Sequence, residues 1–146
     1  METEINSQAV NKKIKLDFKD SKYATGRRKK SIARVWLKKG SGIIHVNGKK
    51  MSDYFQKQNL QIAIFRHLKL VKRENEFDVR CSVKGGGLTG QAGAIIIGLS
   101  RAIIQYEPEL KPTLKKEKLT TRDSRAVERK KYGHRKARRS FQFSKR

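Results

Sequence analysis

The uneven distribution of positive charge limits what this chain can fold into. Its 146 residues contain 37 Lys and Arg against 13 Asp and Glu, which gives a formal net charge of +24. Residues 111–146 hold 15 basic and 3 acidic residues, and therefore half of that net charge. From Gly133 onward the only apolar residues are Ala137, Phe141 and Phe143. Such a segment cannot bury enough surface to offset the entropy of ordering it, so we expect it to be disordered on its own.

Composition divides the chain into three zones. Residues 1–22 have a net charge of only +1 and scattered apolar residues, which indicates a flexible N-terminal arm. Residues 23–110 carry nearly all of the periodic apolar pattern and form the expected globular domain, and residues 111–146 form a basic extension. Because self-repulsion at +24 opposes compaction, we expect a polyanionic partner, and nucleic acid is the first candidate.

The apolar pattern of the middle zone predicts an α+β domain. Alternation predicts strands at 31–37 and 77–83, and a short strand at 43–46 is expected to return along the first as a hairpin. Apolar residues at helical spacing predict a helix at 59–71, preceded by another short helix, and a last helix from Gln91 to about Tyr106. With so few strands, we expect a two-layer structure in which the helices pack on one face of one sheet.

The residues that could support catalysis or bind a metal form no recognisable pattern. His45, His67 and His134 have no nucleophile and no orienting carboxylate at a fitting spacing, so packing or surface roles are expected. Cys81 is in step with the apolar residues of its strand and is expected to be buried. One thiol and three histidines give no zinc-site spacing. We therefore expect no metal, no cofactor and no small-molecule substrate, and the glycine-interrupted apolar stretch 92–99 excludes a membrane span.

A glycine-rich loop, Lys84 to Gly90, precedes the last predicted helix. Consecutive glycines let a backbone approach a phosphate, and a helix N-terminus presents free N–H groups at the positive end of its dipole. The loop is not a P-loop, because no Gly-Lys-Ser/Thr closes it, and it lacks the dinucleotide-binding spacing. Phosphate binding at Gly85, Gly86 and Gly87 and a purely structural turn are equally compatible with this feature.

Two basic runs are the strongest candidates for contacts with nucleic acid. Residues 26–30, Gly-Arg-Arg-Lys-Lys, precede the first predicted strand, and residues 130–139 interleave cations with Tyr132. Arginine pairs with phosphates and stacks on bases. The absence of a regular recognition helix argues against a sequence-reading DNA-binding factor, whereas a tail that folds on contact suits RNA.

Five stretches together resemble one family. They are YATGRRKKSIARV (23–35), GIIHVNG (42–48), GGGLTGQAGA (85–94), TRDSRAVERKKYG (121–133) and QFSKR (142–146). In this order they resemble the ninth protein of the small ribosomal subunit, in its bacterial or organelle form, from Tyr23 to the last residue. The resemblance implies an α+β domain with an unusual left-handed βαβ crossover, followed by a long extended basic C-terminal tail.

The resemblance also implies a structural, non-enzymatic role in translation. The protein would lie in the head of the small subunit, bound to small-subunit rRNA beside other head proteins, in a bacterial cytoplasm or a mitochondrial or plastid matrix. The end of the tail, Ser144, Lys145 and Arg146, would contact tRNA in the peptidyl site. Contacts with rRNA are implied for the basic run of the globular part, the glycine loop and the basic C-terminal segment, namely Arg27, Arg28, Lys29, Lys30, Lys84, Gly85, Gly86, Gly87, Arg122, Arg125, Arg129, Lys130, Lys131, Arg135, Lys136, Arg138 and Arg139.

The sequence departs from the family pattern at three places. Ile96 and Ile97 replace a basic pair, Lys118 replaces a glycine that ends a short helix, and Phe141 replaces a proline. If residue 118 has a positive φ, lysine there costs on the order of 1 kcal/mol. The terminal Ser-Lys-Arg is intact.

Two alternative functions come from other classes. An enzyme could bind nucleotide phosphates at residues 85–90, but no paired carboxylates or metal ligands accompany that loop. A free nucleic-acid chaperone or DNA-coating protein would bind any duplex, whereas the ribosomal interpretation predicts a preference for folded rRNA.

Overall fold

One mixed sheet of five strands organises the fold. The computed structural model describes residues 19–73 and 75–144, and the strand order in the sheet is β1-β2-β5-β3-β4. The expected N-terminal arm lies mostly outside the described residues, and the boundaries drawn at residues 22 and 110 stay predictions. The elements in chain order are β1 (Lys22–Arg28), β2 (Ser31–Lys39), β3 (Ile44–Val46), β4 (Lys49–Lys50), α1 (Met51–Tyr54), α2 (Gln58–Leu70), β5 (Phe77–Lys84), α3 (Leu88–Tyr106), the 3-10 helix η1 (Pro108–Leu110) and α4 (Lys111–Lys116).

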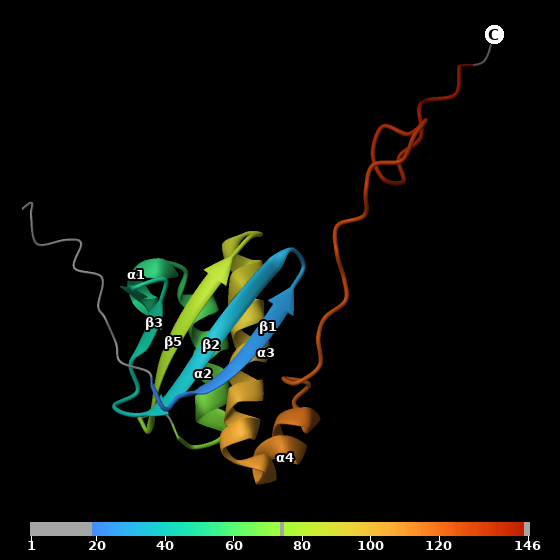
Figure 1. The fold of residues 1–146 in the computed structure, drawn as a ribbon. Coiled ribbons are helices and arrows are strands. Elements are labelled where there is room, and N and C mark those ends of the chain that lie inside the picture. Colours follow the sequence, from blue (N-terminus) through green and yellow to red (C-terminus); the bar gives the residue numbers. More distant parts are fainter. Residues whose placement is uncertain (1–18, 74, 145–146) are drawn as a thin grey trace, which may run out of the picture.

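Helices α2 and α3 cover one face of the sheet, which confirms the predicted α+β architecture (Figure 1). Along β2 and β5 buried and exposed residues alternate, so every second side chain enters the core between sheet and helices. Strands β3 and β5 are parallel, and the chain crosses between them through α1 and α2. In Figure 1 both strands run upward, β5 lies to the right of β3, and the helices lie behind them, so this crossover is left-handed. Right-handed crossovers are the rule, so this hand is a distinctive feature.

The strand at 43–46 does not form a hairpin with β2, contrary to the prediction. Strand β5 lies between them, antiparallel to β2 and parallel to β3. Asp78 of β5 holds the connecting turn, because its Oδ1 accepts hydrogen bonds from the backbone N–H groups of Ser41 (2.8 Å) and Ile43 (3.0 Å). Burial raises the pKa of Asp78, but these hydrogen bonds outweigh it and the net pKa is lowered. The turn therefore carries the chain past the end of β5 to its far side.

The sequence pattern does not reveal β1, because its inward-facing residues are small. Ala24 and Gly26 are buried there, and neither gives an apolar alternation that could be recognised. At Gly26 a Cβ atom would collide with the carbonyl oxygen of Ala94, so β1 lies directly against α3. Helix α3 begins at Leu88, three residues before the predicted Gln91, and ends at Tyr106 as predicted. No helix among residues 19–73 and 75–144 has the length and apolar character needed to cross a bilayer.

Two helices end on a lysine in the left-handed conformation. Lys72 after α2 and Lys118 after α4 both have φ +56°, which meets the condition anticipated for residue 118. Each is the second-to-last residue of a Schellman motif: for α2, Lys72 N–H donates to Lys69 O and Arg73 N–H to Leu68 O, both at 3.0 Å. This conformation favours glycine, since a Cβ atom crowds the neighbouring carbonyl.

We therefore predict that Lys72→Gly increases the free energy of unfolding by roughly 0.5 to 1 kcal/mol, because it removes the left-handed strain. The measurement is urea denaturation followed by circular dichroism. The matched control is Lys69→Gly, three residues earlier within α2, which should destabilise by up to about 1 kcal/mol. Equal effects of the two substitutions would contradict the assignment.

Beyond α4 the chain leaves the domain. Leu114 of α4 is fully buried, so the first residues of the basic extension pack with the domain core. From Leu119 onward the described residues contain no helix or strand. The chain first passes beside the domain, where Leu119 packs against the core, and then extends away from it (Figure 1). We call residues 119–146 the tail.

Candidate nucleic-acid interface

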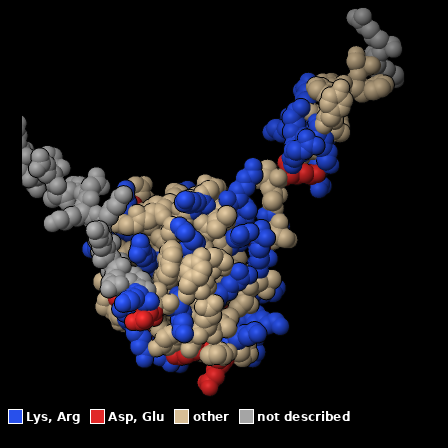
Figure 2. All heavy atoms as spheres, in the orientation of Figure 1, with Lys and Arg blue, Asp and Glu red and all other residues tan. Residues whose placement is uncertain are grey.

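Lysine and arginine side chains are exposed on the globular domain and on the tail. Figure 2 shows them spread over the face of the sheet that the helices leave uncovered, and gathered along the tail. Arg27, Lys29, Lys30 and Lys84 are exposed on the domain, at the end of the sheet where β1 turns into β2 and β5 meets α3. The fold thus brings together cations that are more than fifty residues apart in the sequence.

A cleft of about 470 Å³ lies beside this end of the sheet. Lys29 and Lys30 of the β1–β2 turn form one wall, and Gly86 and Gly87 of the glycine loop form another. Val127 of the tail completes it. The basic run 26–30, the glycine loop and the tail were three separate features of the sequence, and residues from all three line one cleft.

Two of the three loop glycines are required by the fold itself. Gly85 and Gly86 have φ of +73° and +62°, and a Cβ atom on Gly86 would collide with Oγ of Ser31. Ser31 is buried, and its hydroxyl donates a 3.0 Å hydrogen bond to the carbonyl of Gly85. Gly87 is different, since its φ is −109° and a Cβ atom there would meet nothing within 4 Å. The fold therefore explains why residues 85 and 86 are glycine. It does not explain Gly87, which lines the cleft.

The N-terminus of α3 opens into the same cleft. Gly87 is the N-cap residue, and no side chain caps the helix. The first N–H groups of a helix need acceptors from outside it, and they carry the positive end of the dipole. Thr89 lines the cleft beside Lys29 and Lys30, so helix dipole and lysine charge reinforce each other. This combination suits an anion.

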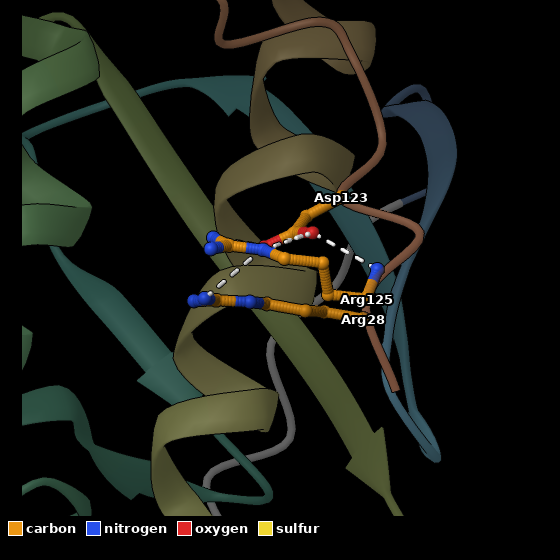
Figure 3. A network of polar contacts seen from close by, with 3 residues as sticks. All are labelled: Arg28, Asp123 and Arg125. Carbon is orange, nitrogen blue, oxygen red and sulfur yellow. Dashed lines mark hydrogen bonds and ion pairs between the residues drawn. The ribbon is translucent and has the colours of Figure 1, made fainter. Parts of the chain in front are cut away.

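A three-residue polar network fixes the start of the tail to the domain (Figure 3). Arg125 donates to Asp123 through its backbone N–H (3.0 Å), Nε (3.1 Å) and Nη2 (3.0 Å). Nη2 of Arg28 on β1 lies 3.5 Å from Oδ2 of the same carboxylate. The Arg28 side chain crosses α3 at Gly93, where a Cβ atom would collide with its Cδ. Arg28 is therefore a partly buried contact between β1, α3 and the tail.

Asp123 is the acid that holds these two guanidinium groups. The hydrogen bonds from the side chain and the backbone N–H of Arg125, with the charges of Arg125 and Arg28, lower its pKa to about 2. Two cations share one carboxylate, so the network keeps a net positive charge. Sequence reasoning missed Asp123 and Gly93; an isolated acid within the basic run 121–133 is the signal that could have indicated the first.

The predicted tail contacts are exposed throughout the described part. Glu128 accepts hydrogen bonds from Arg138 (2.8 Å) and forms an ion pair with Lys131 (2.9 Å), which lowers its pKa. The guanidinium of Arg135 lies 5.5 Å from the ring centre of Phe141. Ser144 is exposed, whereas Lys145 and Arg146 lie outside the described residues. The remaining predicted tail cations, all exposed, are Arg122, Arg129, Lys130, Lys136 and Arg139.

Four other residues that the sequence analysis considered are buried or pack against the core. Cys81 is buried, as predicted, and burial raises the pKa of its thiol to about 12, which makes it unreactive. His45 lies in β3 with 6% of its surface exposed. Ile97 is buried and Ile96 packs against the core, so the two residues that replace a basic pair contribute to the fold.

A small α+β domain with a cation-lined cleft and a long exposed basic tail defines a class, the RNA-binding proteins that pair a compact domain with an extension. Residues 26–146 match the family described as ribosomal protein S9/S16. The match covers most of the chain, so the chain belongs to this family. It is a ribosomal protein of the small subunit that acts in translation, in a family whose role is structural rather than enzymatic.

We predict that Gly86→Ala destabilises the protein by about 1 to 2 kcal/mol or more, because the position needs a positive φ and has no room beside buried Ser31. Gly87→Ala is the matched control and should change the free energy of unfolding by less than about 0.5 kcal/mol. Urea denaturation of both variants measures the difference. Equal stability would show that the loop does not need its glycine at position 86.

We also predict that the Asp123 carboxyl titrates well below its ordinary value of 3.8, with a midpoint near 2. Because the pKa is lowered, the contacts of Asp123 stabilise the docked tail fully above pH 3.8 and are lost as the pH falls through about 2. The carboxyl ¹³C shift followed by NMR reports the midpoint. Arg125→Gln should move it toward 3.8, and Arg129→Gln should leave it unchanged.

Proposed function

We propose that this chain binds small-subunit rRNA through its cleft and tail, and that the end of the tail supports tRNA in the peptidyl site. The ribosome would be of the bacterial or organelle type, and the binding site would lie in the subunit head. The observation that carries the proposal is the tail, whose many described cations are exposed and lie beyond the helices and strands.

The cleft is the proposed rRNA contact of the domain. Lys29 and Lys30 line the cleft and supply charge, and the N–H groups at Gly87 and Thr89 supply donors. Lys84 is exposed at the same end of the sheet and adds a further positive charge. A phosphate of rRNA matches this set, because backbone N–H groups and lysines both bind phosphate oxygens without reading a base. Arg27 extends the same basic surface along β1. Arg28 and Arg125 both pair with Asp123 and thereby orient the start of the tail. Two guanidinium groups share one carboxylate, so the network has a net charge of +1 that can bind a phosphate.

Beyond the polar network of Asp123 and Arg125, the tail requires a polyanion to be ordered. Its internal ion pairs are exposed, and pairs of this kind contribute about 0 to 1 kcal/mol each. That is too little to offset an ordering cost of about 1 to 2 kcal/mol for each residue. Phosphates of rRNA supply the missing energy, through charge-assisted contacts and the release of counterions.

The length of the tail suits a second contact far from the first. Its 28 residues, 119–146, span at most about 90 to 100 Å when fully extended. The domain and the cations of residues 122–139 can therefore bind rRNA while Ser144, Lys145 and Arg146 reach another ligand. A tRNA backbone is that ligand in our proposal, and it takes the two terminal cations as phosphate contacts.

The proposal is tested by sucrose-gradient fractionation of a native lysate, with mass spectrometry of each fraction. We expect the protein to sediment with small subunits and whole ribosomes after a high-salt wash. Recovery in the light fractions would overturn the proposal and favour a free nucleic-acid chaperone.

We predict that deleting Lys145 and Arg146 leaves incorporation into small subunits intact and weakens tRNA binding in the peptidyl site by roughly 3- to 30-fold, since each exposed contact contributes on the order of 1 kcal/mol. Filter binding of tRNA to purified ribosomes measures the effect. The control removes the same charge from α4, by Lys115→Gln with Lys116→Gln, and should leave tRNA affinity unchanged. Equal tRNA affinity after the deletion would contradict the role of the terminal cations.

A further inference from the structure

The face of the sheet opposite the helices carries rows of side chains, of which only Arg27 and Lys84 belong to the rRNA contacts proposed above. Residues of β1, β2 and β5 that point away from the core form rows across these strands. One row is Tyr23, Trp36 and Arg80, and it continues to His45 on β3 and Lys50 on β4. Two further rows lie along the strands, about 6.8 Å apart: Thr25, Arg34 and Ser82, then Arg27, Ile32 and Lys84. We call these rows the open sheet face.

Trp36 is the centre of the open sheet face. Its ring centre lies 5.3 Å from that of Tyr23 at an angle of 46°. The guanidinium groups of Arg34 and Arg80 each lie 5.7 Å from the Trp36 ring centre. Tyr23 and Ile32 are each 43% exposed, so large flat and apolar surfaces meet solvent here. Aromatic rings and guanidinium planes are the surfaces on which unpaired bases stack.

Among the residues that the structure describes, the charged side chains of these three rows on β1, β2 and β5 are all basic. Arg27, Arg34, Arg80 and Lys84 surround the aromatic pair, and Figure 2 shows blue side chains around an uncharged centre on this face. The nearby carboxylate, Asp78, is already engaged by the backbone N–H groups of the 41–43 turn. Cation–π contacts alone would explain why the arginines lie near Trp36, but they would not require further cations in the next row. A ligand with both bases and phosphates accounts for the whole set.

We infer that the open sheet face binds an unpaired segment of RNA, with a base stacked on Trp36 and Tyr23 and its flanking phosphates held by Arg34, Arg80 and the row of Arg27 and Lys84. A duplex does not fit this surface, because its bases are already stacked on one another and present only their edges. An acidic protein segment would match the charge but would leave the aromatic pair unused. The inference rests on the proposed function, since rRNA is the RNA that this chain would meet.

Trp36 is the single tryptophan of the chain, and its fluorescence therefore reports this face alone. The full chain is titrated with a mixed-sequence single-stranded RNA of twelve nucleotides, and in parallel with a duplex of the same length. We expect the single strand to quench Trp36 emission at saturation and the duplex to bind without comparable quenching. Unchanged emission while the labelled single strand is bound would overturn the inference.

Variants separate stacking from charge. Trp36→Leu should weaken binding of the single strand by roughly 5- to 150-fold, the effect of losing one stacked base, with the salt dependence unchanged. Trp36→Phe keeps a ring and should restore most of the affinity. Ile62→Val changes an exposed apolar residue on α2, away from this face, and should have no effect. Circular dichroism confirms folding, and equal affinities of Trp36→Leu and the unaltered chain would overturn the inference.

Assembled ribosomes distinguish this inference from the proposed function. Small subunits that contain the chain are irradiated with ultraviolet light, and the peptide that carries Trp36 is analysed by mass spectrometry. A nucleotide adduct on that peptide supports the inference, whereas a crosslink to another protein shows that a protein covers this face and overturns it. If the chain is absent from small subunits, the proposed function fails, and the oligonucleotide titration still decides whether the face binds unpaired RNA.

Discussion

The close contact between β1 and α3 determines where the functional surfaces of this chain lie. Gly26 has no room for a side chain against the backbone of Ala94, so the strand rests directly on the helix. The turn that follows β1 is thereby placed beside the glycine loop at the start of α3, and both line the same cleft. On the same strand, the side chain of Arg28 crosses α3 and contacts Asp123 of the tail, and the side chain of Tyr23 lies on the open sheet face. One backbone contact thus sets the geometry of cleft, tail and sheet face together.

The few acidic residues near these surfaces organise cations and do not neutralise them. Asp123 holds two arginines and Glu128 accepts from two cations, so each network remains positive. The pairs of Glu128 with Lys131 and Arg138 are exposed and contribute little stability, whereas the partly buried pair of Arg28 and Asp123 holds the start of the tail on the domain. A tail built in this way keeps its charge available, and the free energy that orders it has to come from a polyanion. The domain is therefore stabilised by its own core, whereas the weak ion pairs of the tail do not offset the entropy cost of ordering it.

Much of the fold follows from the sequence, and the exceptions have physical reasons. Strand β2, helix α2 and the end of α3 were predictable because their apolar residues recur at the period of the element. Strand β1 was not, since its inward side chains are as small as Ala24 and Gly26. The place of β5 between β2 and β3 depends on Asp78, a side chain far away in sequence from the turn that it holds. Pairing of this kind is a tertiary property, and no local pattern encodes it.

In the candidate site, too, local features could be predicted from the sequence and tertiary contacts could not. Charge along the sequence indicated that the tail and the hairpin turn are basic, because a run of cations is a local property. It could not indicate that Arg28 and Arg125 converge on Asp123, or that Trp36 lies between Tyr23 and Arg80, since both depend on strand register and on the path of the tail. Phosphate contacts alone position a protein on RNA but do not distinguish one RNA fold from another. The base-binding face and the phosphate-binding cleft that we propose would together supply that distinction, because a folded RNA presents an unpaired base and a phosphate at a fixed separation.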